Sequence, residues 1–276
     1  MNSIGFIGLG NIGAPMAQRL LGRPEGLVVR DLREEATAPF ATGGAIVAQS
    51  NAEVAERCSV ISVMVLDDAQ VRSVVSELLP VARAGTVVAV HSTIHVRTAV
   101  ELAEVAAEQG VHLVDAPVSG GFMGAHDGRL AVMVGGTEEA MERLQGPFSA
   151  FADLVLHVGP VGSGTQMKLA RNMMHFAAYA AAGEAQRLVE AVGIDVKLLG
   201  QVVRHSDAVT GGPGAILVRD TGAPFGPDDP MREPFEHARE LGEKDLTLAL
   251  ELASEAGVPV PIATLALNRL ATELGL

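Results

Sequence analysis

Short apolar runs alternate with longer amphipathic segments from Met1 to about Val158, and this alternation limits the folds open to the chain. The runs are rich in β-branched residues and are apolar without strict alternation, which predicts strands buried on both faces. The stretches between them, such as Asp68–Leu79 and Val96–Gln109, have helical periodicity. We therefore predict an α/β fold, a parallel, doubly wound sheet covered by helices on both faces. The predicted strands are Ile4–Ile7, Leu27–Asp31, Val60–Leu66, Thr86–His91, His112–Asp115 and Leu130–Val134.

The composition changes after the glycine-rich stretch Gly159–Gly164. No proline follows until Pro213, and alanine and leucine dominate the remainder. A long helix is predicted over Thr165–Val192, followed by further helices. We therefore predict two domains, residues 1–162 and an all-helical domain of residues 163–276, joined by this long interdomain helix.

The first predicted strand runs directly into a turn with the spacing Gly-x-Gly-x-x-Gly. Gly8 permits a tight turn, Gly10 lets a pyrophosphate approach the backbone, and Gly13 lets the following helix pack on the strand. The pattern alone is weak, but here it has the strand, turn and helix that it requires. Residues 1–162 are therefore predicted to be a Rossmann-type dinucleotide-binding domain. The turn residues predicted to contact the cofactor are Gly8, Leu9, Gly10, Asn11, Ile12 and Gly13.

Asp31 ends the second predicted strand, 21 residues after Gly10. At this position a carboxylate accepts hydrogen bonds from the adenosine ribose and repels a 2′-phosphate, so NAD is the predicted cofactor. Arg30 and Arg33 flank Asp31, and either guanidinium could reach a 2′-phosphate if Asp31 turned away. NADP is therefore the less favoured alternative, and solvated surface charge is the other interpretation of the two arginines.

A second segment combines a carboxylate, a hydroxyl and two glycines in the order Asp115-Ala116-Pro117-Val118-Ser119-Gly120-Gly121. Asp115 ends a predicted strand, so the following residues should lie at the carboxyl edge of the sheet, where ligands of such sheets bind. The Ser119 hydroxyl and the N–H groups of Gly120 and Gly121 are donors that suit an anion. The segment therefore predicts a pocket for a small carboxylate substrate.

Lys168 begins a polar stripe on the long predicted helix. Lys168, Asn172, His175 and Tyr179 are spaced four, three and four residues apart and so share one face. The surrounding residues are almost all apolar, which predicts a buried helix, and burial favours the neutral form of a lysine amine. A neutral amine can act as general base for an alcohol. Lys168 is thus a candidate catalytic residue, with a solvated first-turn lysine as the alternative.

The acidic balance of the chain excludes several classes of partner. Its 276 residues include 20 Lys and Arg against 33 Asp and Glu, a formal net charge of -13, so it has no long-range attraction for nucleic acid or anionic lipid. Cys58 is the only cysteine, which excludes an intramolecular disulfide and fits a reducing compartment. Neither a signal sequence nor a long apolar stretch is present, and the histidines are scattered. We expect a cytoplasmic protein with no membrane span and no metal.

Four motifs, taken in order, resemble those of the β-hydroxyacid dehydrogenase family, of which 3-hydroxyisobutyrate dehydrogenase is typical. They are the fingerprint Gly8–Pro15, the segment from Asp115 to Gly121 continuing through Leu130, the run Gly162–Asn172, and Lys244-Asp245-Leu246. The match covers nearly the whole chain. It implies an NAD(P)-dependent oxidoreductase that transfers a hydride reversibly between the nicotinamide and the CH–OH carbon of a small β-hydroxy acid.

The resemblance also implies roles for residues on the substrate side. Lys168 matches the family's catalytic lysine, acting as general acid and base, and Asn172 matches its substrate-positioning asparagine. Ser119, Gly120 and Gly121 match the segment that holds the substrate carboxylate.

Further residues match the family's cofactor side. Met64, Val65 and Leu66 match the backbone beside the adenine-ribose half, and Thr93 matches a residue near the nicotinamide. Lys244 matches a lysine that reaches over the cofactor from the helical domain. A surface lysine on an exposed helix is the alternative for Lys244.

Arg171 is a departure from the family pattern, since relatives commonly have a second asparagine beside Asn172. Its guanidinium could pair with a substrate carboxylate, disfavour protonation of Lys168, or point outward. Two other functions remain open. One is reduction of an imine, against which the lysine at the proton-donor position speaks; the other is a non-catalytic dinucleotide-binding regulatory protein. A homodimer or homotetramer is expected by analogy with relatives.

Overall fold

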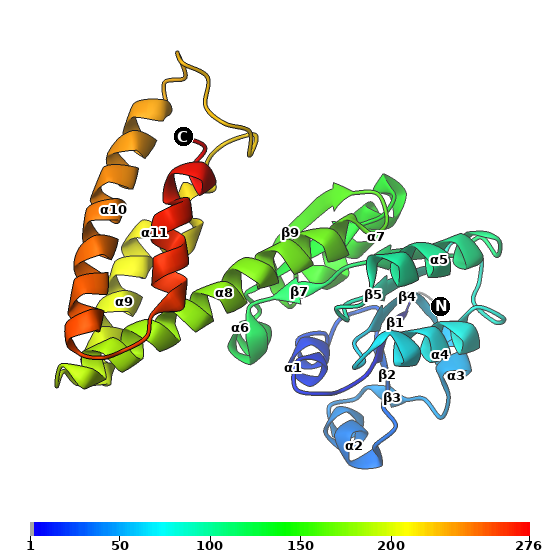
Figure 1. Ribbon diagram of the computed structural model, residues 1–276. Helices are drawn as coiled ribbons and strands as arrows, with labels where there is room; N and C mark the ends of the chain where they lie inside the picture. Colours follow the sequence, from blue (N-terminus) through cyan, green and yellow to red (C-terminus); the bar gives the residue numbers. More distant parts are fainter. Residues whose placement is uncertain (1–2) are drawn as a thin grey trace. The chain divides into compact units, whose positions relative to one another are not determined.

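The computed structural model describes residues 3–276, which form two compact units. One unit ends at Arg171, and the other runs from Asn172 to Leu276. The first contains a nine-stranded sheet with its helices, and the second is helical (Figure 1). The α/β architecture followed by a helical region is as predicted. The domain boundary after residue 162 stays a prediction, since the long helix that starts there contributes residues to both units.

The strands of the sheet have the spatial order β3-β2-β1-β4-β5-β6-β8-β7, with β9 also paired to β8. From β3 to β6 every neighbouring pair is parallel, which gives the strand order of a dinucleotide-binding sheet. The order reverses between β1 and β4, and ligands bind at such a reversal in open α/β sheets. The strands are β1 (Ser3–Ile7), β2 (Leu27–Arg30), β3 (Ile46–Val47), β4 (Cys58–Val63), β5 (Val87–Val90), β6 (His112–Asp115), β7 (Val118–Ser119), β8 (Leu130–Gly135) and β9 (Ala152–Gly159).

The sheet is not parallel throughout, which differs from the sequence prediction. Strand β8 is antiparallel to both β6 and β7. A parallel return needs a crossover long enough to pack a helix across the sheet. The chain between β6 and β8 instead forms β7 and the seven-residue helix α6 (Gly121–Asp127), so it turns back on itself. Strands β3, β7 and β9 were also absent from the prediction.

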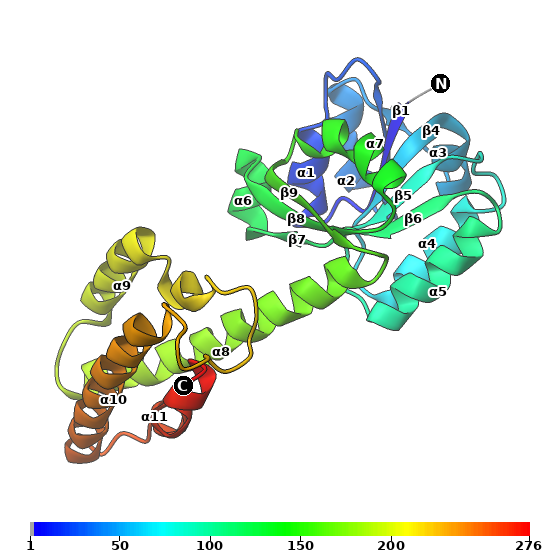
Figure 2. The ribbon, with the colours of Figure 1, turned by 90° about the horizontal axis from the view of Figure 1, so that it is seen from above.

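Alternate residues of the central strands face opposite sides of the sheet, and both sides are buried. In β5, Val87 and Ala89 belong to one apolar cluster, whereas Val88 and Val90 belong to the other. This is why the strands read as continuous apolar runs. Helices α1, α2 and α7 pack on the first side, and α3, α4 and α5 pack on the second (Figure 2). Their bounds are α1 (Gly13–Gln18), α2 (Glu34–Thr42), α3 (Asn51–Arg57), α4 (Asp68–Leu78), α5 (Val96–Ala107) and α7 (Glu138–Phe148).

Local sequence explains how these helices form. In α4 the buried residues Val71, Val74, Val75 and Leu78 follow the spacing of one helical face, and the Asp67 side chain caps the helix by accepting from the Gln70 amide at 2.9 Å. The single cysteine, Cys58, lies in the same apolar cluster as α4. Burial raises the pKa of its thiol to about 12, against a smaller opposing effect of Arg57.

The long helix α8 (Ser163–Ala191) agrees closely with the predicted interdomain helix, but the predicted burial is wrong for the middle of the helix. Met173 is 73% exposed, and Phe176 and Tyr179 are also exposed in the described chain. Apolar periodicity predicts that a surface will be covered, but it does not tell whether the same chain covers it.

The second unit contains the rest of α8 with α9 (Val196–Thr210), α10 (Arg232–Glu255) and α11 (Pro261–Glu273). Its buried apolar cluster is small and is formed by Phe225, Phe235 and Leu274. The Phe225 and Phe235 rings lie 5.0 Å apart, so the polar loop before α10 is held on the unit by an aromatic contact. None of the helices in residues 3–276 combines the length and apolar character that a membrane span requires.

Candidate active site

The three glycines of the β1–α1 turn are glycines for different structural reasons. Gly8 has φ +95°, and a Cβ at this position would overlap the carbonyl oxygen of Met64. A Cβ on Gly13 would overlap the carbonyl oxygen of Gly8, so both residues are required by the packing of the protein itself. Nothing lies within 4 Å of a Cβ built on Gly10, which faces open space. Gly10 therefore leaves room for a ligand beside the backbone.

A cavity of about 710 Å³ opens next to this turn, at the carboxyl ends of β1, β2 and β4. Its volume is in the range of small-molecule and cofactor sites. Together with the open face of Gly10 it fits the adenosine and pyrophosphate parts of a dinucleotide. The lining residues named by the sequence prediction are Gly8, Gly10, Asn11, Ile12, Gly13, Asp31, Met64, Val65 and Leu66.

The sequence prediction missed other residues that line this cavity. Gln70, Ser73, Val74 and Glu77 come from α4, and Asn51 comes from α3. The four α4 residues are spaced as one helical face, which is the only signal that could have grouped them. Nothing in the sequence indicates that this face borders a ligand site.

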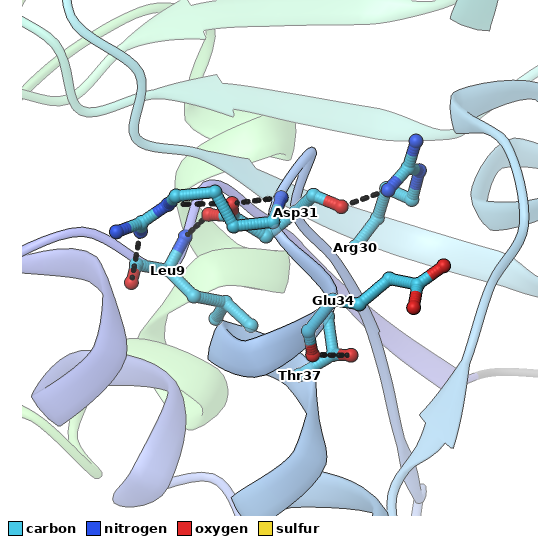
Figure 3. A network of polar contacts seen from close by, with 6 residues as sticks. Leu9, Arg30, Asp31, Glu34 and Thr37 are labelled. Carbon is cyan, nitrogen blue, oxygen red and sulfur yellow. Dashed lines mark hydrogen bonds and ion pairs between the residues drawn. The ribbon is translucent and has the colours of Figure 1, made fainter.

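Asp31 follows β2 directly and is held by three protein donors (Figure 3). Its Oδ2 accepts from the Leu9 amide at 2.7 Å, and its Oδ1 accepts from the Arg33 amide at 2.9 Å and the Arg33 Nε at 3.2 Å. Burial raises the pKa of Asp31, but these hydrogen bonds outweigh it and leave the pKa below its ordinary value. The side chain is therefore an anion at the edge of the cavity.

Both arginines beside Asp31 are engaged with the backbone. The Arg33 Nη2 donates to the carbonyl oxygen of Leu9 at 3.2 Å, so Arg33 bridges the carboxylate and the glycine-rich turn. The Arg30 Nη1 donates to the carbonyl oxygen of Asp31. Arg33 remains largely exposed, and an ion pair at such a surface contributes little to stability.

The loop after β4 is fixed by a residue that the prediction did not name. The Ser92 hydroxyl accepts from the Val65 amide at 3.0 Å and donates to the Val65 carbonyl at 2.7 Å. Ser92 is buried, whereas its neighbour Thr93 is exposed. The buried hydroxyl therefore holds the cavity wall, and the side chain predicted to lie near the nicotinamide is accessible.

Lys168 lies in the second turn of α8 and is only 9% exposed. Its Nζ donates to the carbonyl oxygen of Val118 in β7 at 2.6 Å. Burial lowers the pKa of Lys168, and the charge of Arg171 lowers it further. Among residues 3–276 no carboxylate lies within ion-pair distance of Lys168. The amine therefore has an environment that favours its neutral form, beside the segment that contains Ser119.

The carboxylate of Asp115 faces the protein interior, whereas the predicted anion donors of the same segment are accessible. Asp115 is 1% exposed, and its two oxygens accept from the amides of Gly162 and Thr165 at the start of α8. Ser119 is partly exposed, and Gly120 and Gly121 are exposed with φ of 133° and 64°. The two glycines thus adopt backbone conformations that side chains disfavour, at the beginning of α6.

Comparison with known proteins extends over both units. The family model described as the NAD binding domain of 6-phosphogluconate dehydrogenase matches residues 3–159. The family model described as NAD-binding of NADP-dependent 3-hydroxyisobutyrate dehydrogenase matches residues 162–273. The 3-hydroxyisobutyrate dehydrogenase of Mycobacterium tuberculosis, whose structure is solved with L-serine, is 31% identical with a TM-score of 0.68, over 100% of this chain and 95% of that chain.

The chain belongs to the β-hydroxyacid dehydrogenase family. It is therefore an oxidoreductase with an NAD(P)-binding domain. A Mycobacterium tuberculosis protein named as an oxidoreductase is 58% identical over 99% of this chain and 93% of its own length. A solved oxidoreductase from Mycobacterium avium is 53% identical with a TM-score of 0.96, over 100% of this chain and 99% of that one.

The residues predicted from the family pattern divide between the two units. The structure brings the glycine-rich turn, Asp31 and Met64–Leu66 together around one cavity, and it brings Lys168 to the Val118–Ser119 strand. Asn172 and Lys244 belong to the helical unit. Lys244 is exposed, with its Nζ 3.2 Å from Asp245 Oδ1. The roles of Asn172, Arg171 and Lys244 stay predictions.

Proposed function

We propose that this member of the family oxidises a small β-hydroxy acid reversibly, with Lys168 as the general acid and base. The observation that carries the proposal is the buried Lys168 amine, which contacts a backbone carbonyl and has a lowered pKa. A bound nicotinamide dinucleotide would supply the hydride acceptor and donor. The protein has to supply the proton transfer, the orientation of the substrate and the exclusion of water.

Lys168 can supply the proton transfer in both directions. In oxidation the neutral amine takes the proton of the substrate hydroxyl while a hydride leaves the carbon that bears this hydroxyl. The carbonyl product and the ammonium form of Lys168 are produced together. In reduction the ammonium gives a proton to the carbonyl oxygen as the hydride reaches the carbon, which forms the alcohol. The lowered pKa raises the fraction of neutral amine at a given pH.

The remaining substrate contacts follow from the family resemblance. Ser119 and the N–H groups of Gly120 and Gly121 would bind the substrate carboxylate, close to where Lys168 meets β7. Asn172, four residues after Lys168 in α8, would orient the reacting oxygen. Arg171 would bind the carboxylate or act on Lys168 through its charge, which already lowers the pKa of that residue.

The test compares lysine variants across a panel of 3-hydroxy acids, including 3-hydroxyisobutyrate, 3-hydroxypropionate, serine and glycerate. Lys168→Ala should lower kcat by about 10²–10⁴-fold, the usual contribution of general acid–base catalysis, with the dissociation constant of the dinucleotide unchanged. Lys168→Arg should be equally inactive because a guanidinium does not give up its proton. The exposed Lys197 offers a matched control, and Lys197→Ala should keep full activity. Retained turnover in Lys168→Ala, or no turnover of any panel member by the unaltered protein, would contradict the proposal.

NAD is the cofactor that we propose. Asp31 is an anion at the cavity edge, and a 2′-phosphate there would meet a like charge. The Arg33 guanidinium is bound to Asp31 and to Leu9 rather than free to receive a phosphate. Asp31→Ala should therefore reduce the ratio of kcat/KM for NAD over NADP by about tenfold, which corresponds to about 1.4 kcal/mol. An unchanged ratio would show that Asp31 does not set the preference.

A homo-oligomer is the assembly that we propose. The helical unit has a small buried cluster, and α9 has no buried residue within the described chain. Val209 is 78% exposed, and Val202, Met173 and Phe176 are exposed as well. A helical unit of this size needs more buried apolar surface than one three-residue cluster. A second copy of the chain has the same exposed apolar surface and could cover it in a symmetric contact. Sedimentation should give at least twice the mass of one chain, and a monomer at micromolar concentration would contradict this.

A further inference from the structure

A buried carboxylate links the end of β6 to the start of α8. Asp115 Oδ1 accepts from the Gly162 amide at 2.7 Å, and Oδ2 accepts from the Thr165 amide at 2.6 Å. Asp115 has no cation within ion-pair distance among residues 3–276. Its charge is therefore balanced by two amides and by the positive end of the 29-residue helix.

Two glycines allow this close approach of helix and strands. A Cβ on Gly135, at the end of β8, would overlap Asp115 Oδ1, and a Cβ on Gly164 would overlap the carbonyl oxygen of Met133. A Cβ on Gly164 would also lie 2.7 Å from the carbonyl oxygen of Asp115. At Gly164 the strand ends and the first turn of α8 thus meet backbone to backbone, and at Gly135 the backbone meets the Asp115 carboxylate.

The second link between the same two segments is made by Lys168 itself. Lys168 comes three residues after Thr165, and Val118, whose carbonyl accepts from Lys168 Nζ, comes three residues after Asp115. The segments 115–118 and 162–168 are therefore joined at both ends. One link is the carboxylate on the helix amides, and the other is the amine on the strand carbonyl.

From this arrangement we infer that Asp115 is a positioning residue for Lys168, an inference that rests on the proposed function of that lysine. The Asp115 carboxylate fixes the axial position and rotation of the first turn of α8, and thereby the depth at which the Lys168 amine lies beside Val118 and Ser119. Asp115 itself contacts neither substrate nor cofactor, because both of its oxygens are bound to helix amides. A merely structural cap would stabilise the helix without deciding where the amine lies.

The amine can be followed without turnover because the chain contains three lysines. Reductive methylation of the protein without ligands, resolved by peptide mass spectrometry, reports Lys168 against the exposed Lys197 and Lys244 as internal standards. In Asp115→Asn one of the two helix amides faces an amide donor instead of an acceptor, so the turn should shift. We expect Lys168 to be methylated about tenfold faster relative to the two standards, because the reagent reaches a less buried amine more readily.

Glu184 offers a matched control. It is buried on α8, and its two oxygens accept from the amides of Ile262 and Ala263 at the start of α11, at 2.8 and 3.0 Å. Glu184→Gln therefore removes the same kind of link at another helix. It should lower stability as Asp115→Asn does while the relative methylation of Lys168 stays unchanged.

Activity gives the second measurement. In Asp115→Asn, kcat should fall by about 10–100-fold, since a displacement of about 1 Å can cost that much, while the dissociation constant of NAD stays within about twofold. The inflection of the kcat profile that reports Lys168 should move to higher pH. If Asp115→Asn does not fold, Asp115→Ser, which is smaller and keeps one acceptor oxygen, carries the same test.

Failure of this inference and failure of the proposed function give different results. If Asp115→Asn folds and matches Glu184→Gln in both Lys168 methylation and the pH profile, Asp115 is only a helix cap and the inference is overturned. If Lys168 methylation responds as expected but the unaltered protein oxidises no hydroxy acid, the position of the amine is explained and the proposed function is wrong.

Discussion

The two units of the molecule bury their apolar residues very differently. The sheet unit has an extensive apolar cluster on each face of the sheet, and its largest side chains, such as Phe6, Phe148 and Phe151, are fully buried. The helical unit has a three-residue cluster and many exposed apolar side chains. The comparison teaches that one chain buries far more apolar surface in the first unit than in the second.

Both units nevertheless use the same device to begin a helix. Asp115 binds the first amides of α8, and Glu184 binds the first amides of α11. In the sheet unit the carboxylate is packed against glycine backbone at the strand ends, whereas Glu184 is the one buried polar residue among residues 172–276. The same chemistry is therefore embedded in a full core in one case and in a sparse core in the other.

The largest expected effect comes from the core of the sheet unit. Phe148 is fully buried, with its ring 5.2 Å from that of Phe151 and 5.1 Å from that of His91. Phe148→Ala should lower the free energy of unfolding by about 3–5 kcal/mol, measured by urea titration. Phe176→Ala, at an exposed ring of α8, should change it by at most about 0.5 kcal/mol in a monomer. An equal loss of unfolding free energy in both variants would contradict the difference between the two units. It would show that α8 is covered in the assembled protein.

Acid should affect the sheet unit through His91. Its Nδ1 lies 2.7 Å from the Ala116 carbonyl and its Nε2 3.0 Å from the Ser62 hydroxyl, and burial lowers the pKa of this histidine to about 4. The unfolded chain binds the proton near pH 6.5 and the folded chain only near pH 4, so stability is complete above pH 6.5 and is lost as the pH falls. The loss should approach about 3 kcal/mol at pH 4.

Urea titrations from pH 7 to pH 4 measure this effect. His91→Gln keeps hydrogen-bonding groups but does not titrate. Between pH 7 and pH 4 its free energy of unfolding should therefore fall by about 3 kcal/mol less than that of the unaltered protein. Parallel curves for the two proteins would mean that His91 does not carry the acid sensitivity.

Glu184 should give the smallest of these effects and the one that sharpens the comparison most. Glu184→Gln leaves one of the two α11 amides without an acceptor, which should cost about 1–3 kcal/mol. If the helical unit depends on a second copy, the loss should grow as the protein is diluted, because dissociation then adds to it. A loss independent of protein concentration would show that the helical unit is stable within one chain.

Much of the sheet unit could be predicted because its signals are local. The strands of the parallel core read as apolar runs since both of their faces are buried, and the Gly8–Gly13 spacing is fixed by contacts between neighbouring elements. The short strands β3 and β7 have only two residues each, so no periodicity could reveal them. Strand β9 is partly or fully exposed after its first residue, and its short apolar run of residues 154–156 is flanked by Asp153 and His157.

The site was predictable only in part, because only some of its signals are local in the sequence. Asp31 was found as the last residue of a predicted strand, and Lys168 as the first residue of a polar stripe on a predicted helix. The partners that define their chemistry are distant in sequence: the Val118 carbonyl lies 50 residues from Lys168, and the Leu9 amide 22 residues from Asp31. Asp115 was recognised only as the end of a predicted strand, because the helix amides that bind its carboxylate lie 47 and 50 residues away.

The burial of Cys58 makes the protein suited to site-selective chemistry. Only the thiolate of a cysteine is strongly nucleophilic, and with a pKa of about 12 almost none of it forms at neutral pH. The native cysteine should therefore resist maleimides and mild oxidants and need not be removed before labelling. A reporter attached to a cysteine introduced on the surface, for example in Lys197→Cys, would then be the only label on the protein, because Cys58 would not react.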